Sequence, residues 1–154
     1  DFSRESSRTT HGAQEAIECC VVLARAIGIA LSGATKVHLL NISCAGLSAS
    51  KVVAIAQGEY CNKTRAQITG SGYAVASLEA ALWCVKHTDS FADAVLAAAD
   101  LGDDADTTAA IVGQLAGAYY GVQGIPTGWL DKLCMRDEIE EMADALYGTA
   151  AQTP

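Results

Sequence analysis

Three acidic side chains, Asp103, Asp104 and Asp106, stand within four residues, and Thr107 follows them directly. Carboxylates this close repel one another, and a helix N-terminus offsets only about 0.3–1 kcal/mol for each acid through its dipole and free N–H groups. A divalent cation would offset more. Because Asp104 and Asp106 are two residues apart, a turn can aim both carboxylates at one point, and the Thr107 hydroxyl adds a third oxygen. Such an all-oxygen set suits Mg²⁺, Mn²⁺ or Ca²⁺, not zinc.

The alternative is that these acids simply cap a helix at a solvated surface, which is the usual role of an isolated Asp-x-Asp pair. Two features favour a rigid site. The segment that follows is almost uncharged, so the acids stand at the edge of a core. It also carries Gly113, Gly117 and Gly121 at four-residue spacing, and each Gly costs about 1 kcal/mol against Ala inside a helix. We therefore expect another helix to pack closely there, although close packing alone would not imply a function.

The elements that position these residues are predicted to be helices. The chain of 154 residues is 51% hydrophobic and 18% charged and has only two Pro. Abundant Ala favours helix, and no two-residue alternation indicates a strand. The predicted segments are a helix over 12–31, a helix over 50–57 capped by Ser48, a polar connection over 60–72, a helix over 73–87, a helix capped by Ser90 and stopped by Gly102, a helix from about 106 to before 121, a short helix over 128–134 and an amphipathic helix over 136–148 stopped by Gly148.

The overall charge and the cysteines restrict the partners and the compartment. A net charge of −8 opposes binding to phosphate backbones and to anionic membranes, so we expect neither nucleic acid nor a membrane as a partner. No apolar stretch is long enough to span a bilayer. The six Cys show no CxxC spacing, and most stand among apolar residues, where a thiol behaves as a small apolar side chain. We therefore expect reduced thiols in a cytoplasmic protein.

Three segments, in this order, resemble a known family. GDDADTTAAIVGQLAGAYYG, from Gly102 to Gly121, resembles the C-terminal motif of the ADP-ribosylglycohydrolases, the family that includes dinitrogenase reductase-activating glycohydrolase. SRTTHGAQEAIECC, from Ser7 to Cys20, is similar to the family's Ser-x-x-Thr-His helix start, and SGYAVASLEAALWC, from Ser71 to Cys84, is similar to its central buried helix. Only the acidic motif is highly specific, and the other two support it through their order and spacing.

The resemblance implies an all-α fold, a compact multi-helix orthogonal bundle, with residues 1–154 forming the C-terminal part of a single domain. It implies a binuclear Mg²⁺ or Mn²⁺ centre in which Asp104, Asp106 and Thr107 are metal ligands. Asp103 matches a variable position and is left out. The implied reaction is hydrolysis of the glycosidic bond between ADP-ribose and an acceptor such as protein arginine, so the partner would be an ADP-ribosylated protein or small molecule.

The substrate cleft is expected to involve four further positions. His11 matches the family's motif and could hydrogen-bond a ribose or a carboxylate that holds metal, although a lone His is more often a cap or a surface group. Ser71 and Gly72 lead into a buried helix whose free N–H groups could receive phosphate oxygens. Tyr73 could stack on a ribose or on the departing group, and a capped turn with a half-buried Tyr is an equally good interpretation.

Part of the family pattern is not found in this sequence. The family's N-terminal half carries an acidic helix and a Thr-Asp-Asp segment that complete the metal site, and neither is present here. We therefore expect the N-terminal part to be missing, and to be supplied by another chain or a lost segment; a second copy of this chain is the other expected partner. No catalytic residue is assigned, because Asp104 and Asp106 would hold metal and could not act as the general base. The alternative function is a non-catalytic ADP-ribose or nucleotide-binding module, and the third is a helical structural subunit.

Overall fold

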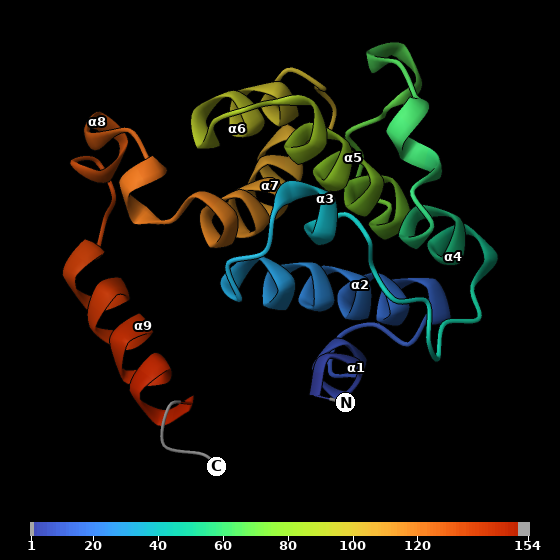
Figure 1. Ribbon diagram of the computed structural model, residues 1–154, viewed down its shortest axis with the longest axis horizontal. Coiled ribbons are helices and arrows are strands. Elements are labelled where there is room, and N and C mark those ends of the chain that lie inside the picture. Colours follow the sequence, from blue (N-terminus) through green and yellow to red (C-terminus); the bar gives the residue numbers. More distant parts are fainter. Residues whose placement is uncertain (1, 151–154) are drawn as a thin grey trace. The chain divides into compact units, whose positions relative to one another are not determined.

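The computed structural model describes residues 2–150 (Figure 1). Within this range the chain forms helices and no strand, so the all-α prediction is confirmed. The α-helices are α1 (Phe2–Arg8), α2 (Gln14–Leu31), α3 (Lys36–Leu39), α4 (Ser50–Ala56), α5 (Ala74–His87), α6 (Phe91–Ala99), α7 (Ala105–Tyr120), α8 (Thr127–Leu130) and α9 (Arg136–Ala150). Three short 3₁₀-helices are η1 (Glu59–Asn62), η2 (Arg65–Gln67) and η3 (Val122–Gly124).

The chain divides into two compact units, residues 1–124 and 125–154. The second unit contains α8 and α9, and α9 places Ile139, Met142 and Leu146 at helical spacing. The prediction that Gly148 stops this helix is wrong, because α9 continues to Ala150 and Gly148 does not adopt a left-handed conformation. A single Gly costs only about 1 kcal/mol in a helix, which does not force an end. A single domain over residues 1–154 stays a prediction.

The core of the first unit lies where α2, α5 and α7 contact one another. Each of the three helices contributes side chains that are fully buried, and a buried Val or Leu stabilises the fold by about 1.5–3 kcal/mol relative to leaving it exposed. α6 packs on α5 and α7, whereas α1, α3 and α4 pack on α2. The fully buried residues of α2, α5 and α7 include Val22, Ala26, Ala81, Leu82, Val112 and Leu115.

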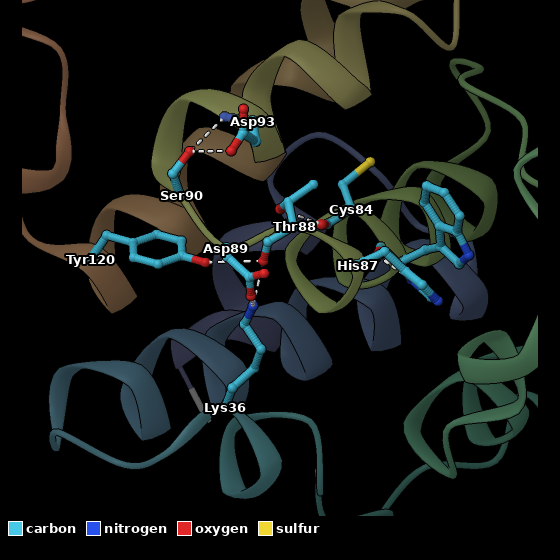
Figure 2. Close-up of polar contacts among 9 residues, drawn as sticks. Lys36, Cys84, His87, Thr88, Asp89, Ser90, Asp93 and Tyr120 are labelled. Carbon is cyan, nitrogen blue, oxygen red and sulfur yellow. Dashed lines mark hydrogen bonds and ion pairs between the residues drawn. The ribbon is translucent and has the colours of Figure 1, made fainter.

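The turn between α5 and α6 joins three elements through one backbone carbonyl (Figure 2). The Thr88 carbonyl oxygen accepts hydrogen bonds from Lys36 Nζ of α3 and, at 3.2 Å, from Tyr120 Oη of α7. Ser90 begins the next helix, since its Oγ accepts a bond of 3.0 Å from Asp93 N. The predicted Ser90 cap is therefore confirmed. Such caps stabilise a helix by about 1 kcal/mol.

A buried carboxylate takes the place of the predicted Ser48 cap. α4 begins at Ser50 after Ala49, and Ser48 Oγ makes no capping bond within this helix. Ser48 Oγ donates instead to Glu18 Oε1 at 2.9 Å, and Ala49 N donates to Glu18 Oε2 at 2.8 Å. Glu18 belongs to α2 and its exposed fraction is 0%. Another helix thus fixes the two residues that lead into α4, and the predicted Ser48 cap is wrong.

The glycines of α7 do not mark close helix packing. Among the described residues, a Cβ built on Gly113 would meet no atom within 4 Å. A Cβ on Gly117 would meet Phe91 Cε2 at 3.8 Å, which is an ordinary contact. Gly121 has a φ of +71° and ends the helix. The expected backbone-to-backbone packing is therefore wrong at Gly113, because this face of α7 has no neighbour there.

Candidate active site

The acidic turn lies at the N-terminus of α7. Asp104 occupies the N-cap position, yet its carboxylate makes no capping hydrogen bond. The first turn is closed by the main chain instead, since the Asp104 carbonyl accepts bonds from Thr108 N at 3.0 Å and Thr108 Oγ1 at 2.9 Å. Asp106 Oδ1 accepts a bond of 2.9 Å from the adjacent Thr107 N. The Asp104 carboxylate is not used as a cap, so simple capping does not explain its position.

The glycine-rich loop before α5 lies directly against this acidic turn. Gly70 O accepts a hydrogen bond of 3.4 Å from Asp104 N. A Cβ on Gly70 would lie 3.0 Å from Gly102 O. A Cβ on Gly72 would lie 3.2 Å from Asp104 Oδ2. Glycine permits this approach because it has no side chain. The glycine-rich loop and the acidic turn are thus neighbours in the fold, although the contacting residues lie 32 to 34 positions apart in the chain.

A cavity of about 230 Å³ lies beside the loop and the turn. Three of the predicted site residues, His11, Gly72 and Thr107, line it together. The rest of the wall is mainly apolar and comes from α2, α5 and α7, with Ser7 from α1. The His11 ring is exposed, and its Nδ1 lies 2.9 Å from Thr10 Oγ1. The other lining residues are Ser7, Ala16, Cys19, Cys20, Leu23, Ala74, Ser77, Leu78 and Ile111.

The remaining predicted residues have different positions. Ser71 stabilises the loop, because its Oγ accepts a bond of 3.3 Å from Tyr73 N and its carbonyl accepts one of 2.5 Å from Ser77 Oγ. Tyr73 lines a second cavity, of about 330 Å³, and its hydroxyl donates to Glu15 and accepts a bond of 3.0 Å from Lys51 Nζ. The sequence analysis missed Glu15 and Lys51, and no motif of this chain points to either.

One of the two thiols in the wall of the first cavity, that of Cys19, is not suited to nucleophilic chemistry. Burial, together with the nearby Cys20, Glu15 and Glu18, raises the pKa of Cys19 to about 12. A thiol must ionise to act as a nucleophile or metal ligand. Cys19 therefore contributes an uncharged, apolar wall.

The donor set of the acidic turn fits a hard divalent cation. Asp104, Asp106 and Thr107 offer oxygen atoms only, and Mg²⁺ is commonly held by one or two carboxylates while it keeps several waters. Within residues 2–150, no three His, Cys, Asp or Glu side chains gather as a metal-binding group. The described residues therefore offer two carboxylates and one hydroxyl, a part of a coordination sphere.

Comparison with known proteins defines first the class of fold and then the family. The chain is similar to a solved structure described as an ADP-ribosylglycohydrolase-related protein complex, with a TM-score of 0.84 and 42% sequence identity over 94% of this chain and 50% of that chain. This defines the fold as the helical ADP-ribosylglycohydrolase type. A family model described as ADP-ribosylglycohydrolase matches residues 1–154, and the chain belongs to this family.

Named relatives agree with this membership. The chain is 46% identical to the ADP-ribosylarginine hydrolase Tri1 of Pseudomonas putida (strain GB-1) over 95% of this chain, and 41% identical to the Tri1 of Serratia proteamaculans (strain 568) over 97%. It is 44% identical, over 52% of this chain, to the ADP-ribosyl-[dinitrogen reductase] glycohydrolase of Rhodospirillum rubrum. These alignments cover 39%, 41% and 28% of the three proteins. The chain therefore spans less than half the length of each.

No helix within residues 2–150 has both the length and the apolar character needed to cross a membrane.

Proposed function

We propose that this chain is part of a metal-dependent hydrolase that cleaves the glycosidic bond between ADP-ribose and an acceptor such as arginine. One observation carries the proposal: His11, Gly72 and Thr107 line one cavity, and Gly72 lies against Asp104. Two relatives named as ADP-ribosylarginine hydrolases support arginine as the acceptor. The substrate is then an ADP-ribosylated protein or small molecule.

The residues of the cavity and of the acidic turn beside it would divide the work as follows. Asp104, Asp106 and Thr107 would hold Mg²⁺ or Mn²⁺, in a binuclear centre, and the metal would supply a polarised water. His11 would donate a hydrogen bond to a ribose hydroxyl, and Gly72 would let the substrate approach the main chain. These contacts would fix the ribose while positive charge develops on its ring. Because both Asp side chains are committed to metal, the general base would come from another part of the whole protein.

The extent of the protein and its partners belong to the same proposal. The chain would be the C-terminal part of a single helical domain, completed by an N-terminal-half chain or segment, or associated as a homo-oligomer. The alignments cover 39% and 41% of the two arginine hydrolases, which supports the proposal that this chain corresponds to one part of a longer domain. All six cysteines lie in the described part of the chain and are free thiols, which supports the proposed cytoplasmic location.

A second candidate function is a non-catalytic ADP-ribose or nucleotide-binding module, or a partner subunit. It is favoured by the small number of metal donors, because the acidic turn offers only two carboxylates and one hydroxyl, a part of a coordination sphere. No three His, Cys, Asp or Glu side chains gather as a metal-binding group within residues 2–150. A cleft of this kind could retain ADP-ribose without hydrolysing the bond.

Release of ADP-ribose from an ADP-ribosylated arginine substrate separates these functions. The assay would use the 154-residue chain with Mg²⁺ or Mn²⁺, alone and with the N-terminal half of the Pseudomonas putida relative. We expect turnover when both halves are present, and its loss in the variant Asp104→Asn with Asp106→Asn. Asp103→Asn is the matched control and should retain turnover, because Asn tolerates the left-handed φ of 53° at this position. Binding of ADP-ribose without turnover in any mixture would support the second function.

A further inference from the structure

The phenol of Tyr73 is held by two charged side chains from different helices. Its hydroxyl donates to Glu15 Oε2 of α2 and accepts a bond of 3.0 Å from Lys51 Nζ of α4. The side chain of Tyr73 is 44% exposed. A half-exposed aromatic ring at the start of a helix would ordinarily change rotamer freely. Here both the donor and the acceptor function of its hydroxyl are occupied.

Lys51 also restrains the ring itself. Its ammonium lies 5.1 Å from the centroid of the Tyr73 ring, within the range of a cation–π contact. The same ammonium lies 3.7 Å from Glu15 Oε1. The Tyr73 contacts and the charge of Glu15 raise the pKa of Lys51, so the ammonium stays charged at neutral pH. Three groups thus contact one another in pairs, and a change at any one of them affects both others.

Glu18 keeps the helix that carries Lys51 in place. Its carboxylate accepts bonds from Ser48 N, Ser48 Oγ and Ala49 N at the start of α4. Glu15 and Glu18 are three residues apart on α2, which places them on neighbouring positions of this helix. α2 therefore acts on Tyr73 directly through Glu15 and indirectly through α4.

We propose that Glu15 and Lys51 are positioning residues that hold the Tyr73 ring at the wall between the two cavities, with Glu18 fixing α4 beneath them. Tyr73 lines the larger cavity, whereas its neighbours Gly72 and Ala74 line the cavity that contains His11 and Thr107. A ring fixed at this wall presents one constant surface to a ligand. The expected effect on ADP-ribose affinity rests on the proposed function, whereas the restricted motion of the Tyr73 ring does not.

Fluorine NMR of the chain labelled with 3-fluorotyrosine tests the order of the ring directly. The chain contains five Tyr, and Tyr73→Phe identifies the resonance of Tyr73. We expect Lys51→Met and Glu15→Gln to shift and narrow this resonance, and Lys51→Arg to restore most of the original shift. Lys63→Met is the matched control, since Lys63 lines the same cavity but pairs with Glu79 at 2.6 Å.

Calorimetric titration with ADP-ribose tests the consequence for binding. We expect Lys51→Met to weaken binding by about threefold to tenfold, the change that corresponds to losing one exposed hydrogen bond and one cation–π contact. Lys51→Arg should recover binding and Lys63→Met should leave it unchanged.

Each outcome decides a part of the inference. An unmoved Tyr73 resonance in both Lys51→Met and Glu15→Gln would overturn the positioning role, as would an equal shift in Lys63→Met. A shifted resonance with unchanged ADP-ribose affinity would overturn the role in binding. Failure of the wild-type chain to bind ADP-ribose would instead overturn the proposed function, while the NMR shifts would still decide how Tyr73 is held.

Discussion

Replacing the buried Glu18 by Gln should destabilise the first unit of the chain through α4. The carboxylate is fully buried and accepts bonds from Gln14, Ser48 and Ala49. Three of these acceptor contacts use Oε1, namely those from Gln14 Nε2 at 2.6 Å and from Ser48 N and Ser48 Oγ at 2.9 Å. Glutamine can keep all three with its carbonyl oxygen, so Glu18→Gln changes mainly the second oxygen and the charge.

The magnitude follows from what remains at the second oxygen. In Glu18→Gln the amide NH₂ would face Ala49 N, which donates to Glu18 Oε2 at 2.8 Å in the wild type. One hydrogen bond to a charged acceptor is lost, worth about 1.5–3 kcal/mol, and a partly buried N–H is left without an acceptor. We therefore expect a loss of about 2–4 kcal/mol in the free energy of unfolding. That is a large share of the 5–15 kcal/mol that is typical of a folded domain.

Urea denaturation followed by circular dichroism measures this loss, and amide hydrogen exchange locates it. Protection in Glu18→Gln should fall first in peptides that cover residues 47–56. Glu79→Gln is the control, because Glu79 has one partner, Lys63, and is 17% exposed; such a pair near the surface contributes about 0–1 kcal/mol. Equal stability of the wild type and Glu18→Gln, with unchanged protection of α4, would refute the anchoring role.

Four further perturbations have defined outcomes. Burial raises the pKa of Glu18, but its hydrogen bonds lower the pKa more, from 4.5 to about 2. The stability from this carboxylate should therefore be full above pH 4.5 and should fall as the pH drops toward 2. Unfolding measured across this range should depend less on pH in Glu18→Gln than in the wild type. Gly70→Ala should lower the thermal midpoint and the free energy of unfolding, the latter by about 1–3 kcal/mol, because the new Cβ would lie 2.9 Å from Leu101 Cβ. Gly113→Ala should raise the free energy of unfolding by about 0.5–1 kcal/mol, because its Cβ would meet no atom within 4 Å. Ser90→Ala removes the α6 cap and should cost about 1 kcal/mol in the same melts.

The sequence predicted the buried helices well because their signal is local. α5 was expected over 73–87 and spans Ala74–His87, and α7 was expected from about 106 and spans Ala105–Tyr120. Both contain long apolar stretches bounded by residues that begin or end a helix. α1 was not predicted, because its sequence is polar and its helical conformation depends on packing against α2.

The sequence predicted in part which residues the fold brings together, and the roles of these residues stay predictions. The motifs pointed to His11, Gly72 and Thr107, which the fold brings to one cavity. The residues that hold Tyr73 were not predicted, because Lys51 is 22 and Glu15 is 58 positions away in the chain. Contacts over such separations follow from the packing of α2, α4 and α5, and no spacing rule encodes them. The contacts of Glu18 with Ser48 and Ala49 were not predicted for the same reason.

Electron paramagnetic resonance of Mn²⁺ mixed with this chain tests the role of the acidic turn most directly. Free Mn²⁺ gives a sharp signal that decreases when the ion is bound. The account predicts that the wild-type chain and Asp103→Asn reduce this signal, and that the variant Asp104→Asn with Asp106→Asn does not. A wild-type chain that leaves the signal of free Mn²⁺ unchanged, or a double variant that binds Mn²⁺ as well as the wild type does, would contradict it.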